Sequence, residues 1–181
     1  MTFLELIRIR QSVRKYDAGR PVAEEKIGRC LEAARLAPSA CNSQPWKFIV
    51  VDEPGRVAAL AAATFGKLVS FNQFTREAPL FIVIVAEPPK IVAGIGGLIK
   101  NKPYYLMDIG IAAEHFCLQA AEEGLGTCML GWFDEAGVKK LLRIPAFKRV
   151  PLIISLGYPV TDRVLDKNRK NKEQVVSYNE Y

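Results

Sequence analysis

The sequence predicts an α+β domain in which helices wrap a central sheet. Two helical patterns precede the first strand-like run, and helical patterns separate the later strand-like runs. This order differs from the regular strand–helix alternation of a doubly wound fold. With 181 residues, half of them hydrophobic, the chain has the size of one domain and can bury a sizeable core. We therefore expect one domain over residues 1–160 and a C-terminal extension over 161–181.

Two helices are expected before the first strand. In the first, from Thr2 to about Arg10, the apolar side chains recur at helical spacing behind Thr2, a favoured N-cap residue. The second opens at Pro21 and ends at the Ala37-Pro38 dipeptide, because proline disfavours a helical residue before it. Its inward stripe consists of Ile27, Cys30, Leu31 and Ala34.

The rest of the domain alternates between strands and helices. Strands are expected at residues 46–51, 80–86, 127–130 and 150–156, and helices at 54–66, 104–123 and 134–142. The run at 80–86 is continuously apolar, which is typical of a strand buried on both faces. The 104–123 helix is the natural central helix, since small residues at Gly110 and Ala112 allow close packing. Its apolar face consists of Leu106, Ile109, Ala113, Phe116 and Ala120.

Two loops are candidates for function. The polar segment from Pro38 to Pro45 has a proline at each end, so we expect a fixed loop, and such loops often carry function. The stretch from Pro88 to Pro103 is rich in proline and glycine and is a candidate lid, which we extend to Tyr105. Its Gly-Ile-Gly-Gly run at 94–97 fits neither common phosphate-loop pattern.

The distribution of charge limits the classes of partner that we expect. Lysine and arginine number 25 against 19 acids, a net charge of +6, and the cations cluster at residues 8–20 and 163–172. Aromatic residues do not interleave with these clusters, and no helix-turn-helix or zinc-finger spacing accompanies them, so we expect no nucleic-acid partner. Two explanations of the cationic clusters remain: a solvated surface, or a binding site for a phosphorylated ligand.

The sequence shows neither a membrane-length apolar run nor a secretion-signal pattern, so we expect a cytoplasmic protein without a membrane partner. Four scattered cysteines indicate reduced thiols, and a single histidine argues against a metal site. That histidine, His115, lies mid-helix, which disfavours a catalytic triad. Cys41 is expected to be a small buried hydrophobe, with a reactive thiol as the alternative.

Four short motifs, taken together, carry a resemblance. They are Arg-Gln-Ser-Val-Arg at 10–14, Pro-Ser-Ala-Cys-Asn-Ser-Gln-Pro-Trp at 38–46, Leu-Gly-Trp-Phe at 130–133 and Lys-Asn-Arg at 167–169. In order and spacing they resemble the FMN-dependent nitroreductase family over nearly the whole chain. The resemblance implies a homodimer of the nitroreductase-like fold, with a central mixed, mainly antiparallel sheet wrapped by helices. It further implies that the long central helix lies in the dimer interface, that the tail is swapped onto the partner subunit, and that each of two interfacial clefts holds a tightly bound FMN.

The resemblance also implies roles for particular residues. The FMN phosphate would be held by Arg10, Ser12, Lys167 and Arg169. Gln11 would lie near the ribityl chain, and Arg14 would approach the N1/O2 edge of the ring and favour flavin reduction. The partner's loop would supply Pro38, Ser39, Ala40, Asn42 and Gln44. Asn72 would bond the pyrimidine edge, and a backbone N–H in the Leu130, Gly131 and Trp132 segment would bond flavin N5.

In that family no side chain acts as a nucleophile, because the flavin carries the chemistry. The implied reaction is ping-pong hydride transfer through flavin N5, from NAD(P)H to acceptors such as nitroaromatics or quinones. Within the same fold, an ene or enone reductase, a reductive dehalogenase and a flavin-destroying enzyme are alternatives. A non-catalytic flavin-binding or redox-sensing protein, with Cys41 as the switch, is the alternative from another class.

Overall fold

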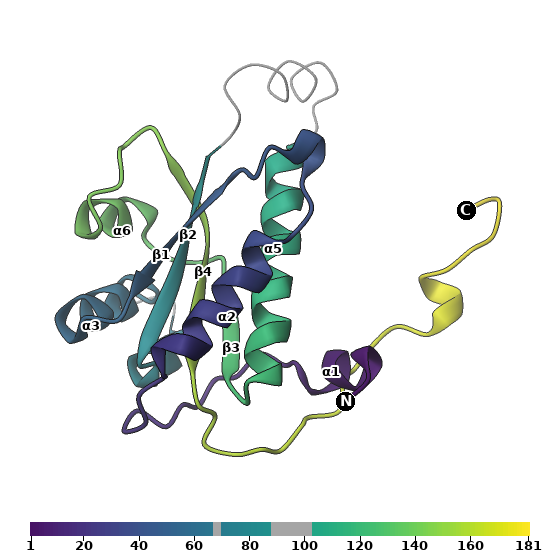
Figure 1. Cartoon of the computed structure of the whole chain (residues 1–181), viewed down its shortest axis with the longest axis horizontal. Helices are drawn as coiled ribbons and strands as arrows, with labels where there is room; N and C mark the ends of the chain where they lie inside the picture. The colour runs from purple at the N-terminus through teal and green to yellow at the C-terminus, as the bar shows by residue number, and fades with distance from the viewer. Residues whose placement is uncertain (67–69, 88–102) are drawn as a thin grey trace.

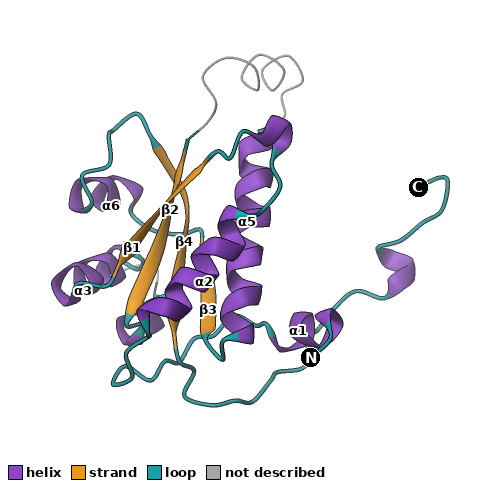
Figure 2. Cartoon of the chain, viewed as in Figure 1, coloured by secondary structure: helices purple, strands orange, loops and turns teal. Residues whose placement is uncertain are grey.

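A computed structural model describes residues 1–66, 70–87 and 103–181. These residues form a four-stranded sheet with the strand order β1-β2-β4-β3, in which every neighbouring pair is antiparallel (Figure 2). The strands are β1 (Trp46–Val51), β2 (Leu80–Ala86), β3 (Gly126–Leu130) and β4 (Arg149–Gly157). The strand order places β2 and β4 in the middle, so the continuously apolar run lies where both faces of the sheet are covered.

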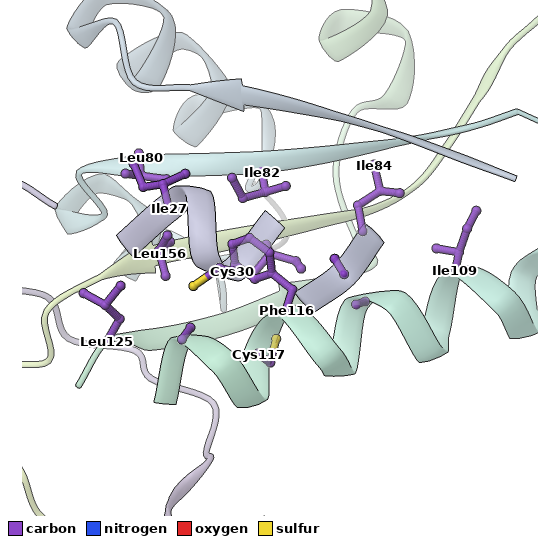
Figure 3. Close-up of a cluster of buried hydrophobic side chains, with 14 of the residues drawn as sticks. Ile27, Cys30, Leu80, Ile82, Ile84, Ile109, Phe116, Cys117, Leu125 and Leu156 are labelled. Atoms are coloured by element: carbon purple, nitrogen blue, oxygen red, sulfur yellow. The ribbon is translucent and has the colours of Figure 1, made fainter. Parts of the chain in front are cut away.

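Helices cover both faces of this sheet, as Figure 1 shows. One face carries α2 (Glu24–Arg35) and α5 (Tyr104–Glu122), and the other carries α3 (Pro54–Ala63) and α6 (Glu135–Leu141). Successive side chains of β2 serve the two layers in turn, because neighbouring strand residues point to opposite faces. Ile82 packs with the α2 and α5 side chains in Figure 3, whereas Phe81 packs on the side of α3 and α6. The α+β prediction is confirmed.

The short helix α1 (Phe3–Ile9) begins with the expected Thr2 cap. The Thr2 hydroxyl accepts from the Glu5 N–H at 3.3 Å, and the Glu5 carboxylate accepts from the Thr2 N–H at 2.7 Å. This reciprocal pair is a capping box. No residue of α1 is buried, so its apolar side chains Phe3, Leu4 and Ile7 remain exposed in the single chain.

Some predicted boundaries and faces were wrong. Helix α2 begins at Glu24 rather than Pro21, because Ala23 has an extended backbone and serves as the N-cap residue. Helix α3 ends at Ala63 because Thr64 turns the chain there and bonds its hydroxyl to the Ala61 carbonyl at 2.8 Å. Leu106 is 42% exposed, so it does not share the buried face of α5.

The C-terminal tail, residues 160–181, first follows the N-terminal segment of its own chain and then extends away from the body (Figure 1). It contains a single 3₁₀ turn, η3 (Lys172–Gln174), and apolar side chains at Val175, Val176 and Tyr178 that are exposed. The candidate lid at 88–103 lies outside the described residues, apart from its last position. Among the described residues, no helix is both long and apolar enough to cross a membrane.

Candidate cofactor site

Residues 10–14 form a short extended segment beside β3. Ser12 and Thr127 form an isolated parallel bridge, and the Val13 N–H donates to the Thr127 carbonyl at 2.8 Å. Gly126 permits this approach, since a Cβ atom there would lie 2.6 Å from Cγ2 of Val13. Because Gly126 has no side chain, residues 10–14 can lie this close to β3, and this places Ser12 beside Thr127.

Arg10 follows α1 and faces α5. Its Nε lies 3.1 Å from Oε1 of Glu114, but this atom is buried and makes no aligned hydrogen bond with any described residue. A buried guanidinium N–H without an acceptor is costly unless another group binds it. Arg10 is thus suited to receive an anion.

Lys167 of the tail completes a cationic cluster with Arg10 and Arg169. Its ammonium donates a hydrogen bond to the Arg10 carbonyl oxygen. Burial lowers the pKa of Lys167, and the neighbouring charges of Arg10 and Arg169 lower it further. Glu114 is the counter-charge that opposes this effect. The two basic ends of the sequence therefore meet, and an anion such as a phosphate would relieve their mutual repulsion.

The other predicted residues of this segment line the junction with the tail. Ser12 and Arg14 border a hollow of about 350 Å³, together with Arg163 and Leu165 of the tail. Gln11 crosses this junction, with both ends of its side-chain amide bonded to the tail backbone. The resemblance implied a position near the ribityl chain for Gln11 but gave no indication of these tail contacts.

Asn72 holds the backbone that follows β3. Its Nδ2 donates to the Trp132 carbonyl at 3.2 Å and to the Thr64 carbonyl at 3.1 Å. The Asn72 carbonyl in turn accepts from the Thr75 hydroxyl, which lies 2.8 Å from the Thr64 hydroxyl. Since Asn72 is buried, this network fixes the orientation of the Trp132 peptide and leaves the Asn72 side-chain oxygen to bind a donor.

The end of β3 passes from core to surface within three residues. Leu130 is a buried member of the core on the α3 and α6 side, whereas Gly131 and Trp132 are exposed. The Trp132 ring, 59% exposed, lies with its centroid 6.4 Å from that of Phe71, which is 64% exposed. Two open aromatic rings beside the Asn72 network can stack on a planar ligand. Phe71 was not among the predicted site residues.

The proline-bounded loop is held in an unusual conformation. It contains the 3₁₀ turn η1 (Ala40–Asn42), and Cys41, Asn42 and Gln44 have φ values of 54°, 52° and 45°. Such left-handed residues cost about 1 kcal/mol or more each unless the surroundings hold them. Here the Gln44 N–H donates to the Ser39 hydroxyl at 2.9 Å, and the Gln44 side chain donates to Asn42 Oδ1 at 3.1 Å. Pro38 precedes the turn and is exposed.

Asp108 anchors this loop from α5. Its Oδ1 accepts from the Ala40 N–H at 3.1 Å, while its buried Oδ2 has no hydrogen-bond partner among the described residues. The sequence interpretation missed Asp108. The available signal was a lone acid among apolar residues on the buried side of α5, beside Ile109 and Ala112.

Cys41 is exposed, so the expectation of a buried hydrophobe was wrong. The left-handed backbone at residue 41 turns its side chain out of the loop instead of into the core. The other three cysteines, Cys30, Cys117 and Cys128, are buried free thiols. Burial raises the pKa of Cys30 and of Cys117 to about 12, which keeps both protonated at neutral pH.

Within one chain, the loop and the cationic cluster lie toward opposite ends of α5 (Figure 1). The loop contacts Asp108 near the amino end, whereas Arg10 and Gln11 line a hollow of about 210 Å³ with Ala121 near the carboxyl end. From Asp108 to Ala121 the helix rises about 20 Å, at roughly 1.5 Å per residue. One chain therefore brings Arg10 together with Lys167 and Arg169, joins Asn72 to Trp132 after β3, and holds residues 38–44 at the amino end of α5.

Known proteins resemble this chain in sequence and fold. The model of the nitroreductase family matches residues 7–158. A candidate NADH dehydrogenase/NAD(P)H nitroreductase of Archaeoglobus fulgidus is 32% identical, with 88% of this chain and 87% of that protein covered. An iodotyrosine deiodinase of Thermotoga neapolitana is 28% identical, with 98% and 97% covered.

The solved structures agree with the sequence comparisons. The structure of an FMN-dependent nitroreductase from Clostridium difficile R20291 superposes with a TM-score of 0.80 at 28% identity, covering 99% of this chain and 100% of that one. Because the family model spans most of the domain and the fold agrees over its whole length, the chain belongs to the nitroreductase family.

Proposed function

We propose that this protein is an FMN-dependent NAD(P)H oxidoreductase that reduces small organic acceptors. The observation that carries the proposal is the junction of the two basic segments. The buried Arg10 Nε lies 3.1 Å from the Glu114 carboxylate without an aligned hydrogen bond to any described residue, and Lys167 carries a positive charge that burial disfavours. A phosphate group satisfies both, and FMN carries one at the end of its ribityl chain.

Different residues of the chain bind different parts of this cofactor. Arg10, Ser12, Lys167 and Arg169 bind the phosphate, and Arg14 places a fixed positive charge beside the ring. Asn72 would bond the ring through its free side-chain oxygen, and its bond to the Trp132 carbonyl holds the segment after β3, whose backbone N–H would bond flavin N5. The chemistry that FMN supplies when bound is two-electron transfer from NAD(P)H to a second substrate, in two half-reactions.

We further propose that the site is completed by a second copy of the chain. The loop at 38–44 is bonded to Asp108 near the amino end of α5, whereas Arg10 of the same chain contacts Glu114 and lines a hollow with Ala121 toward the carboxyl end. Two α5 helices packed antiparallel about a two-fold axis bring the carboxyl half of one beside the amino half of the other. In such a homodimer, Ser39, Ala40 and Asn42 reach the flavin bound by the partner subunit.

The exposed apolar surface supports this assembly. Met107 and Ile111 are exposed on α5, and Phe3 and Leu4 are exposed on the adjacent α1. Exposed apolar side chains on two helices that contact each other are typical of an interface. The tail beyond Arg169 cannot bury Val175 or Val176 on its own chain, so we propose that it wraps the partner subunit.

Reductive dehalogenation is a second candidate, favoured by one observation. The iodotyrosine deiodinase of Thermotoga neapolitana matches this chain over 98% of its length. The same cofactor site would then deliver electrons to a halogenated phenol, and the exposed rings of Phe71 and Trp132 would stack on it.

An anaerobic titration tests the proposed function. We expect the purified protein to bind FMN and to lose its absorbance near 450 nm when NADH or NADPH is added. The reduced protein is then mixed separately with a nitroaromatic, a quinone and iodotyrosine. Reoxidation by the first two supports the oxidoreductase, and preferential reoxidation by iodotyrosine supports the dehalogenase. Protein-bound FMN that stays oxidised with both nucleotides would refute both functions and indicate a flavin-binding protein.

A further inference from the structure

Gln11 makes a two-point contact with the tail. Its Nε2 donates to the Arg163 carbonyl at 2.9 Å, and its Oε1 accepts from the Leu165 N–H at 3.0 Å. A primary amide carries a donor and an acceptor side by side, so it can pair with a peptide backbone as a neighbouring strand does. The amide nitrogen and the amide oxygen of Gln11 thus both form hydrogen bonds with residues far away in the sequence.

This contact limits where the cationic residues of the tail can lie. Lys167 follows Leu165 by two residues, and an extended chain spans at most about 3.6 Å per residue. Holding Leu165 against Gln11 therefore keeps Lys167 within reach of the Arg10 carbonyl, which its ammonium does bond. The hollow beside this contact is bordered by residues 11–15 on one side and by 159, 161, 163 and 165 on the other.

A neutral clamp is needed here because the charges oppose the docking. Arg10, Lys167 and Arg169 are all cationic, and the charges of Arg10 and Arg169 both disfavour the ammonium form of Lys167. Without a bound anion, their repulsion opposes the docking of the tail on the N-terminal segment, and the single carboxylate of Glu114 offsets it only in part. The Gln11 hydrogen bonds carry no net charge and stabilise the docked tail under these conditions.

We infer that Gln11 is a positioning residue, which clamps residues 163–165 so that Lys167 and Arg169 meet Arg10 around the FMN phosphate. This inference rests on the proposed function. It differs from a direct contact of Gln11 with the flavin, because it assigns the effect of Gln11 to the phosphate end of the cofactor alone. By linkage, phosphate binding also strengthens the docking of the tail.

Riboflavin provides the decisive comparison, because it has the same ring and ribityl chain as FMN but lacks the phosphate. We would prepare apoprotein of the wild type and of the Gln11→Leu, Lys167→Met and double variants, and measure both dissociation constants by flavin fluorescence. Gln11→Leu removes two hydrogen bonds of about 1 kcal/mol each. Gln11→Leu should weaken FMN binding roughly thirtyfold. It should leave riboflavin binding nearly unchanged, which also shows that the variant is folded.

The double variant tests whether Gln11 acts through Lys167. If it does, adding Gln11→Leu to Lys167→Met should weaken FMN binding less than Gln11→Leu weakens it in the wild type. Tail docking gives a readout without activity. FMN should slow tryptic cleavage at residues 167–172 in the wild type, and protect them less in Gln11→Leu.

Three results would overturn the clamp: equal losses of FMN and riboflavin affinity in Gln11→Leu, fully additive losses in the double variant, or unchanged FMN binding. The failure of the proposed phosphate site looks different. In that case the wild-type protein itself binds riboflavin as tightly as FMN, whereas a failure of the clamp alone leaves a wild-type preference for FMN that Gln11→Leu retains.

Discussion

At the scale of single residues, the proposed site depends on buried polar groups that lack a hydrogen-bond partner among the described residues of one chain. Among the described residues, the buried Arg10 Nε makes no aligned hydrogen bond although Glu114 lies 3.1 Å away, and the buried Oδ2 of Asp108 has no donor. Burial of such groups is unfavourable unless they serve a ligand or a partner. The two residues lie at the two halves of the proposed site, which is where a cofactor and a second subunit would complete them.

Arg10 gives the sharpest prediction at this scale. Replacing Arg10 with alanine removes a charge-assisted hydrogen bond of about 1.5–3 kcal/mol and should weaken FMN binding roughly ten- to a hundredfold. Arg169→Ala should act in the same direction. Isothermal titration of the apoproteins measures both effects.

Arg8→Ala is the matched control, since Arg8 is an exposed cation on α1 outside the proposed site. It removes the same charge two positions earlier and should change FMN affinity less than twofold, a margin we set at about 0.4 kcal/mol. An equal loss in Arg8→Ala and Arg10→Ala would mean that only net charge matters, and would remove the specific role of Arg10.

At the scale of elements, the packing of β3 against residues 10–14 positions the site. A Cβ atom on Gly126 would meet three atoms of Val13 within 3 Å, so Gly126→Ala should displace the segment that carries Ser12. We expect a lower melting temperature and weaker FMN binding. Gly28→Ala on α2 is the matched substitution, since nothing lies within 4 Å of its Cβ position.

Gly28→Ala should stabilise the protein by about 0.5–1 kcal/mol, because alanine favours a helix interior over glycine. Thermal unfolding of both variants measures the contrast. Equal changes in the two melting temperatures would contradict the close packing of Gly126 on Val13.

The α6–β4 connection predicts a pH dependence. Burial alone would raise the pKa of Glu135, but hydrogen bonds from Arg149, the Val150 N–H and Lys139 outweigh burial and lower the pKa to about 2. A lowered pKa contributes stability above the unfolded value of about 4.3, which is lost as the pH falls toward 2. Denaturant titrations should therefore show a smaller loss of stability between pH 4.5 and 2 in Glu135→Gln than in the wild type. An identical loss in both proteins would refute this role of Glu135.

At the scale of the whole molecule, α5 divides the proposed site. The loop at 38–44 and the cationic cluster lie toward its two ends, and the exposed face between them includes Ile111.

A charged residue in the centre of an apolar interface leaves an uncompensated charge. Ile111→Glu should therefore yield a monomer that binds FMN at least tenfold more weakly. Ultracentrifugation measures the mass, and Phe147→Glu, on an exposed residue of the α6–β4 turn, should stay dimeric. A dimeric Ile111→Glu protein would contradict this interface.

The sequence was sufficient to predict the main elements, because their periodicity and caps are local signals. The continuously apolar run at 80–86, the Thr2 cap and the helix from Tyr104 are examples. The meeting of Arg10 with Lys167 was implied by the resemblance, and their direct contact needed the structure. The exposed Cys41 and the tail contacts of Gln11 could not be predicted, since they depend on a left-handed backbone and on long-range packing. For Asp108, the lone acid on the buried side of α5 was a signal, but its bond to the Ala40 N–H needed the structure.

A mixed dimer tests the central claim that each cofactor is bound by two chains. Arg10→Ala damages the phosphate residues, and Ala40→Trp places a bulky side chain on the loop. The two chains carry different affinity tags, and the mixed dimer is purified through both. FMN is added at a concentration between the dissociation constants of the wild type and of Arg10→Ala, so that each variant alone binds little. If the loop serves the partner subunit, the mixed dimer contains one intact site and should bind about half as much FMN as the wild type. A mixed dimer as empty as its two parents would show that loop and phosphate residues of the same chain form one site, and would contradict the account.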